Sequence, residues 1–245
     1  MKTTRSKAEN LSLFAADLTW ADIPPAVREQ AKLQILDAVG TGIAATAYPF
    51  AQKAVAGVNA LGGNGACSVI GQGTQLSARD AALANGMLMH GLDFDDTHLA
   101  SIIHASVACL PAALAVAEAT GASGQDLLVA YVAGMETAIR VGLAANGAFH
   151  HAGYHATAIA SHFSSAVIAG KLMGLDADAL TMAQGIAGSS AAGIQVFLEE
   201  GAWTKRFHPG WGAVAGITAA TLAQNGFIGP RRPYEGKFGL FETHL

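Results

Sequence analysis

The chain has 245 residues, of which 51% are hydrophobic and 13% charged, with a formal net charge of −4 at pH 7. So apolar a chain is not disordered, and without a basic block it offers no nucleic-acid surface. The N-terminus lacks the apolar run of a signal peptide, and the longest apolar run, around residues 105–117, contains Pro111 and is too short to span a bilayer. Cys67 and Cys109 stand in apolar surroundings without metal-type spacing. We therefore predict a cytoplasmic, reduced protein with no membrane partner.

Small residues recur at three- and four-residue spacing and predict helices along most of the chain. Segments of this kind cover residues 78–91, 105–121, 124–145, 155–174, 176–193 and 212–227. Ser77 and Ser123 precede two of these segments as N-caps, and Ser77 has Asp80 three residues later, as in a loose capping box. Asp176 or Asp178 is expected to cap the helix that follows Gly174.

Strands are scarce, and residues 67–71 ("CSVIG") are the only good candidate. Because strands and helices do not alternate, we exclude a Rossmann-type sheet, and the glycine-rich pieces lack the context of phosphate loops. We predict an all-α fold, a bundle of largely buried helices that pack closely through small residues. A monomer of this size has too much surface to bury so many apolar helices, so we expect a homodimer with an apolar helix in its interface.

One candidate domain boundary lies at residues 229–233, "GPRRP". We predict one all-helical domain over residues 1–230. Residues 231–245 are expected to begin a linker toward a second domain that this sequence does not contain.

The first group of chemically active residues is "HGLDFDDTHLASIIHAS", residues 90–106. On a helix, Asp93 and Thr97 would share one face, with His90 three residues before Asp93 and His104 within two turns. Imidazoles beside carboxylates are typical of sites that move protons on anionic substrates.

Two alternatives remain for this segment. Asp95 or Asp96 could cap a helix that carries "THLAS", with the other acids solvated. The acids and histidines could instead bind a metal, but the segment has neither thiolates nor a two-histidine spacing such as HExxH. No metal is predicted.

A second group is "FHHAGYHATAIAS", residues 149–161. His155 stands at the start of a predicted helix, where an imidazole beside a helix N-terminus suits a bound carboxylate. His150 and His151 are better explained as part of a histidine-rich surface loop.

A third group is "EGAWTKRFHPGWGAVAG", residues 200–216. Lys205 and His208 are expected just before a helix of small residues, which would place a positive charge close to apolar helices. The alternative for Lys205 is a surface lysine, and Arg206 is expected to be a surface or structural residue.

Together these segments resemble the MmgE/PrpD family, which includes 2-methylcitrate dehydratase, cis-aconitate decarboxylase and iminodisuccinate epimerase. The resemblance is carried by "NGMLMHGLDFDDTH", "GYHATAIASHFSSAVIAGKLMGL" and the long segment from "TKRFHPGWGAVAG" to "YEGKFGLF", and "QILDAVGTGIAA" is similar to the family's opening. It implies a helical domain that dimerises, a smaller α+β lid domain and no organic cofactor. Family chains are generally much longer, so this chain is expected to be either a fragment or a short relative whose site is open to water.

The resemblance also implies a set of site residues, although the histidine after the "DFDDT" motif comes one residue later here than in decarboxylase-like members. By motif, the positions are Asp93, Thr97, His104, His155, Lys205 and His208. We predict His104 as the proton-transfer residue, and Lys205 with His155 as the groups that bind carboxylates and stabilise charge. Asp93 would tune an imidazole or the lysine, and Thr97 and His208 would contact substrate. Asp96 is expected to be a helix cap.

The predicted function is that of a lyase that abstracts a proton next to a carboxylate of a small di- or tricarboxylate, most similar to 2-methylcitrate dehydratase. Decarboxylation or epimerisation of a related acid is the first alternative, because the shared motifs serve all three reactions. A non-catalytic helical dimer is the second.

Overall fold

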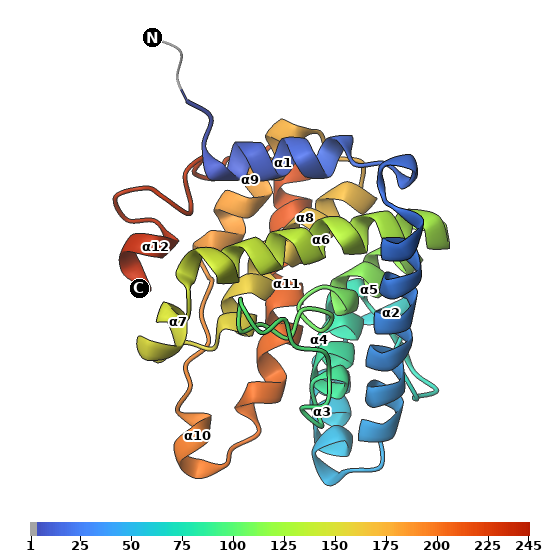
Figure 1. Ribbon diagram of the computed structural model, residues 1–245. Helices are drawn as coiled ribbons and strands as arrows, with labels where there is room; N and C mark the ends of the chain where they lie inside the picture. The colour runs from blue at the N-terminus through green and yellow to red at the C-terminus, as the bar shows by residue number, and fades with distance from the viewer. Residues whose placement is uncertain (1–3) are drawn as a thin grey trace.

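Helices make up most of the structure, a computed structural model that describes residues 4–245 (Figure 1). The longer helices are α1 (Lys7–Asp17), α2 (Pro25–Ala45), α3 (Pro49–Ala60), α4 (Ala78–Met89), α5 (Leu110–Thr120), α6 (Gly124–Ala145), α8 (Ala156–Leu172), α9 (Ala177–Gly188) and α11 (Thr204–Gln224). The short elements are the 3-10 helix η1 (Trp20–Asp22), the one-turn helices α7 (Ala148–His151), α10 (Phe197–Glu200) and α12 (Leu240–Thr243), and the antiparallel strands β1 (Asn64–Ser68) and β2 (Gln75–Leu76). This architecture confirms the all-α prediction for the described residues.

Helices α4, α6, α8 and α9 form close to where the small-residue pattern predicts them, and their caps explain why. The Ser123 hydroxyl accepts from Asp126 N–H, and Asp126 returns the contact, which completes a capping box. The Ser77 hydroxyl accepts from Asp80 N–H at the start of α4, and Asp176 caps α9. These side chains satisfy amide groups that a helix start leaves without partners.

Other boundaries differ from the prediction. Residues 105–109 form turns rather than the first turns of α5, and the predicted strand at 67–71 overlaps β1 only at its first two residues. Helix α11 starts eight residues before the predicted start at 212, so Lys205 and His208 lie inside it rather than in front of it. The N-terminal helices α1, α2 and α3 were not predicted as elements.

Helix α11 runs through the middle of the bundle, where it packs against α4, α8 and α9 (Figure 1). Its crossing with α8 is close because Gly212 and Gly216 lie directly on the backbone and Cβ atoms of Ser161 and Ser165. Its crossing with α4 brings Gly86 onto the backbone of Gly210, where no Cβ would fit. These contacts place the C-terminal end of α4 and the N-terminal ends of α8 and α11 side by side, which is where the site forms.

Helix α6 is the one described helix that is long and apolar enough to cross a membrane. Its most apolar 18-residue window is 67% buried inside the bundle, which is typical of a core helix. Cys67 and Cys109 are buried free thiols, and burial raises the pKa of both, so they behave as small core residues. The cytoplasmic location stays a prediction.

The segment after residue 229 packs back on the bundle. Tyr234 is buried, and its hydroxyl donates to Gln184 Oε1 at 2.9 Å. Arg231 bridges Asp178 at 2.6 Å and Glu9 at 3.2 Å on the surface. That residues 231–245 lead toward a second domain stays a prediction.

Candidate active site

A small cavity opens where the loop after α4 meets the N-terminal ends of α8 and α11. Its volume is about 160 Å³, and its walls are Thr97, Ile102, His104, His150, His155, Gln195, Phe197, Leu198 and Lys205. Four of the six predicted site residues therefore line one cavity, although they lie as much as 108 positions apart in sequence. Asp93 contacts two of the lining residues at its edge, and His208 lies behind His155.

The segment between His90 and His104 is a loop, so the shared helical face proposed for Asp93 and Thr97 is wrong. Asp93 and Ile102 both adopt left-handed backbone conformations, with φ of 60° and 54°. Such a conformation is tolerable for Asp but strained for a β-branched residue. The Asp96 carboxylate accepts a hydrogen bond from the backbone N–H of Ser106. Bonds of this kind between side chains and the backbone compete with helix formation and favour the irregular loop.

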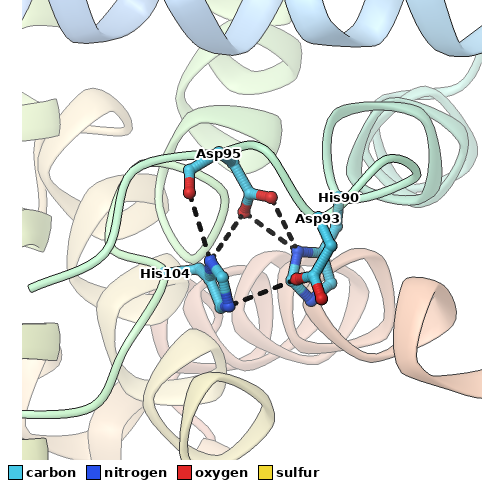
Figure 2. A group of neighbouring side chains, drawn as sticks. All are labelled: His90, Asp93, Asp95 and His104. Atoms are coloured by element: carbon cyan, nitrogen blue, oxygen red, sulfur yellow. Dashed lines mark hydrogen bonds and ion pairs between the residues drawn. The ribbon is translucent and has the colours of Figure 1, made fainter.

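Neither Asp95 nor Asp96 caps a helix, which corrects both of those interpretations. Asp95 is buried, and its carboxylate lies 2.9 and 3.1 Å from His90 Nδ1 and 3.4 Å from His104 Nδ1 (Figure 2). Asp96 accepts from the backbone N–H of Ser106 at 2.9 Å, and burial raises its pKa. Asp96 therefore connects the loop to the backbone at Ser106, while Asp95 contacts the imidazoles of His90 and His104.

His104 lies between two carboxylates. Its Nε2 is 3.4 Å from Asp93 Oδ1, and its Nδ1 faces Asp95 (Figure 2). The same Nδ1 lies 3.3 Å from Thr97 Oγ1. Its backbone N–H donates to the Thr157 hydroxyl at 3.1 Å, which anchors it to α8. Burial lowers the pKa of His104, although the charge of Asp95 acts in the opposite direction. The imidazole is thus neutral near pH 7 and close to a partner that can stabilise its charged form.

Lys205 forms an ion pair with Asp93, the residue that also contacts His104. Burial alone would raise the pKa of Asp93, but the hydrogen bond and charge of Lys205 outweigh it and hold that pKa below its ordinary value. Lys205 is half-buried and Asp93 exposed, so this pair is open to a ligand. The alternative of a solitary surface lysine is therefore wrong.

His155 and His208 form a buried pair, with 3.1 Å between their Nδ1 atoms. The ring of Phe197 packs edge-on against both imidazoles. Burial lowers the pKa of His155 well below its ordinary value and lowers that of His208 to about 4, and the neighbouring His90 adds to both shifts. At neutral pH both rings are uncharged, so His155 can offer a ligand a hydrogen bond but no positive charge.

The histidines before His155 differ from the expected surface loop. They lie on helix α7, where His150 lines the cavity and is partly buried while His151 is exposed. Arg206 is structural, as expected: its Nε donates to Gly91 O at 2.7 Å and its guanidinium stacks over Phe50.

Sequence reasoning passed over His90 and Asp95 as site residues. Both side chains are fully buried, and the His90 ring stacks on His155 at 5.6 Å and meets His104 edge-on at 4.8 Å. His90 Nε2 has no hydrogen-bond partner among residues 4–245. The sequence did contain a signal for them: both residues stand close to apolar segments, which indicates burial. A buried histidine or aspartate usually has a polar partner, so the two could have been expected to pair.

Four side chains of this site could together hold a metal ion. His90, Asp93, Asp95 and His104 offer donor atoms that all lie within 4.8 Å of one another. The ammonium group of Lys205 already binds the Asp93 carboxylate, so a metal would have to displace it.

Comparison with known proteins adds a second line of observation. The family model described as the MmgE/PrpD N-terminal domain matches residues 9–245. A cis-aconitate decarboxylase-like protein of Aspergillus oryzae is 32% identical over 238 residues, which are 94% of this chain and 49% of that protein. The cis-aconitate decarboxylases of Aspergillus terreus and Homo sapiens are each 31% identical, over 93% and 97% of this chain and 48% and 50% of their own lengths. The chain spans about half the length of the curated relatives it matches.

Proposed function

The chain belongs to the MmgE/PrpD family, and we propose that it supplies the helical side of the active site of a carboxylate lyase. On the sequence motifs alone, dehydration was the first candidate reaction. Similarity to cis-aconitate decarboxylases instead supports decarboxylation of a small unsaturated tricarboxylate as the reaction. Dehydration is the second candidate.

The observation that carries this proposal is the contact series Lys205–Asp93–His104 at the edge of the cavity. It places a cation and a neutral imidazole against the same carboxylate oxygen, Asp93 Oδ1. A substrate carboxylate that binds Lys205 competes with Asp93 for the ammonium group, and this brings the substrate within reach of His104. Thr97 and His155 then offer hydrogen bonds from neighbouring walls.

In the proposed reaction on cis-aconitate, the bond from the methylene carbon to its carboxyl group breaks and releases CO₂. Its electron pair forms a new double bond, and the former double bond shifts its electrons to the far carbon, which takes a proton. We assign delivery of this proton to His104. Lys205 stabilises the negative charge that develops meanwhile. The product has the carbon skeleton of itaconate.

Protonation separates the two candidate reactions. Decarboxylation requires the charged His104 as an acid, whereas dehydration requires the neutral ring as a base. Because burial lowers the pKa of His104, decarboxylation by this chain should accelerate as the pH falls toward that pKa. Dehydration should slow over the same range.

The cavity of about 160 Å³ is smaller than the roughly 300–1,000 Å³ usual for ligand sites. Among the described lining residues, Lys205 is the one lysine or arginine. We propose that a tricarboxylate needs further walls and cations, supplied by a second domain or a second copy of the chain.

A homodimer stays part of this proposal. Leu33, Leu36 and Ile43 lie at helical spacing on α2 and are 60%, 68% and 52% exposed. An apolar helix face of this kind supports a subunit contact. Replacement of Leu36 by Glu should shift the mass in multi-angle light scattering from dimer to monomer, and an unchanged mass would exclude this face.

The test is proton NMR of the chain in D₂O with cis-aconitate, 2-methylcitrate, citrate and iminodisuccinate in separate tubes. Itaconate from cis-aconitate would support the proposal, and a new vinyl signal from a hydroxy acid would favour the dehydratase. His104→Gln should lower the rate about 10²–10⁴-fold, whereas His151→Gln, on an exposed histidine outside the cavity, should not. Unchanged spectra together with unshifted His104 ring signals in all four tubes would contradict it.

A further inference from the structure

We propose that Asp95 is the positioning residue of this site: its buried carboxylate holds the rings of His90 and His104 in one orientation, with the Nε2 of His104 facing Asp93. This inference rests on the proposed function for its catalytic meaning, but its geometric content can be tested without any substrate.

The buried carboxylate of Asp95 contacts two imidazoles at once. Its side chain has no exposed surface, and both carboxylate oxygens contact His90 Nδ1, at 2.9 and 3.1 Å. The oxygen nearer to His90 also lies 3.4 Å from His104 Nδ1. Figure 2 shows the two rings on either side of Asp95, each with Nδ1 toward it and Nε2 away from it.

This arrangement fixes the tautomer of His104. Its Nδ1 faces the Asp95 carboxylate and, at 3.3 Å, the Asp95 backbone carbonyl, and both groups can only accept hydrogen bonds. Nε2 also faces an acceptor, Asp93 Oδ1, but that oxygen already accepts from Lys205, whereas two acceptors of Asp95 face Nδ1. We therefore assign the ring proton of neutral His104 to Nδ1. The lone pair is then on Nε2, 3.4 Å from Asp93 Oδ1 and on the side of the Lys205 ion pair. A proton that His104 gains or loses in a reaction is thus exchanged at Nε2.

His90 completes the support from the other side. Its Nδ1 contacts both carboxylate oxygens of Asp95, and its ring meets His104 edge-on and stacks on His155. Because a buried carboxylate without hydrogen bonds is costly, His90 also keeps Asp95 in place. His90 thus acts on the site through Asp95.

Asp96 provides a matched comparison. It is the adjacent residue, it is half-buried, and it accepts from Ser106 N–H at 2.9 Å and from Gln34 Nε2 at 3.2 Å. An asparagine at position 96 keeps the acceptor for Ser106. At position 95 an asparagine removes the negative charge, and its NH₂ group faces a ring N–H of His90 or forces that ring into the other tautomer.

The experiment is two-bond ¹⁵N–¹H correlation NMR of the histidine rings in the unsubstituted chain, in Asp95→Asn and in Asp96→Asn. We expect the Nδ1–H tautomer of His104 in the unsubstituted chain and in Asp96→Asn. In Asp95→Asn we expect a mixed or Nε2–H tautomer and a lower titration midpoint for His104, because the charge that opposes the effect of burial is gone. An Nε2–H tautomer in the unsubstituted chain would overturn the proposal even if Asp95→Asn did not fold. An unchanged tautomer and midpoint in a folded Asp95→Asn would overturn it equally.

A second readout separates this inference from the proposed function. If the chain turns over substrate, Asp95→Asn should lower kcat about 10²–10⁴-fold with little change in KM. A loss confined to KM would overturn the positioning role. If no substrate is turned over and none shifts the His104 ring signals, the proposed function fails while the tautomer result still decides the role of Asp95.

Discussion

Replacement of glycine by alanine at two helix positions should have opposite effects on stability. Gly40 is exposed in α2, and a Cβ there would meet no atom of the described residues within 4 Å. Gly86 is buried in α4 against the backbone of Gly210. Alanine gains about 0.8–1.0 kcal/mol of helix propensity over glycine at either position. At Gly86 it also adds overpacking of about 1–3 kcal/mol, so Gly86→Ala should be the less stable variant by that amount.

Thermal unfolding followed by circular dichroism measures the difference, since one kcal/mol shifts Tm by about 2–4 °C for a chain of this size. Gly40→Ala should raise Tm and Gly86→Ala should lower it or leave it near the unsubstituted value. Equal stabilisation by both substitutions would refute the reasoning, because it would mean that α4 and α11 do not meet at Gly86. Gly86→Ala should also loosen the Lys205–Asp93 contact, which depends on the same crossing.

Three further predictions concern single groups. Lys205→Met should raise the pKa of Asp93, because it removes the hydrogen bond and charge that oppose the effect of burial; ¹³C NMR of the carboxyl group measures this, and an unchanged midpoint would contradict the ion pair. The depressed pKa of His208 means that the unfolded chain binds its proton more readily than the folded chain. Stability should therefore be complete above about pH 6.5 and fall as the pH drops toward 4, by at most about 1.4 kcal/mol per pH unit for this group, and urea unfolding of His208→Gln should show a weaker pH dependence. Asn85 accepts from Ile70 N–H at 2.8 Å and donates to Ser68 O at 2.9 Å inside the fold. Asn85→Leu should cost about 1–3 kcal/mol for each backbone group left unpaired, and a loss below that in urea unfolding would show that water replaces the amide.

The helices that were predictable from sequence carry their own start and stop signals. Ser123 with Asp126 marks the start of α6, and Asp176 marks that of α9, because a cap depends on residues only three positions apart. The start of α11 was missed because Trp203 precedes it without a capping side chain and Pro209 lies inside it. The first turns of α11 are stabilised by contacts with other helices, and a local sequence pattern cannot reveal such contacts.

The candidate site was predictable in most of its members, but neither His90 and Asp95 nor the geometry was predicted. Thr97, His104, His155 and Lys205 were found by motif, and they line one cavity. The role of Asp95 depends on its distance to two imidazoles, one five and one nine positions away along a loop with left-handed residues. Such a path has no periodicity, so spacing arguments assigned a helix there instead. Which of these residues act in catalysis stays a prediction.

The charge state of the cavity has a consequence for how fast a ligand can arrive. Lys205, the one lysine or arginine among the described lining residues, is already paired with Asp93, and the formal net charge of the chain is −4. A tricarboxylate that diffuses toward the cavity is therefore repelled at long range rather than steered in. Salt shortens the reach of that repulsion to about 8 Å at 0.15 M ionic strength. Encounter with the isolated chain should accelerate as salt is added, which is the reverse of the behaviour of a site that attracts its substrate electrostatically.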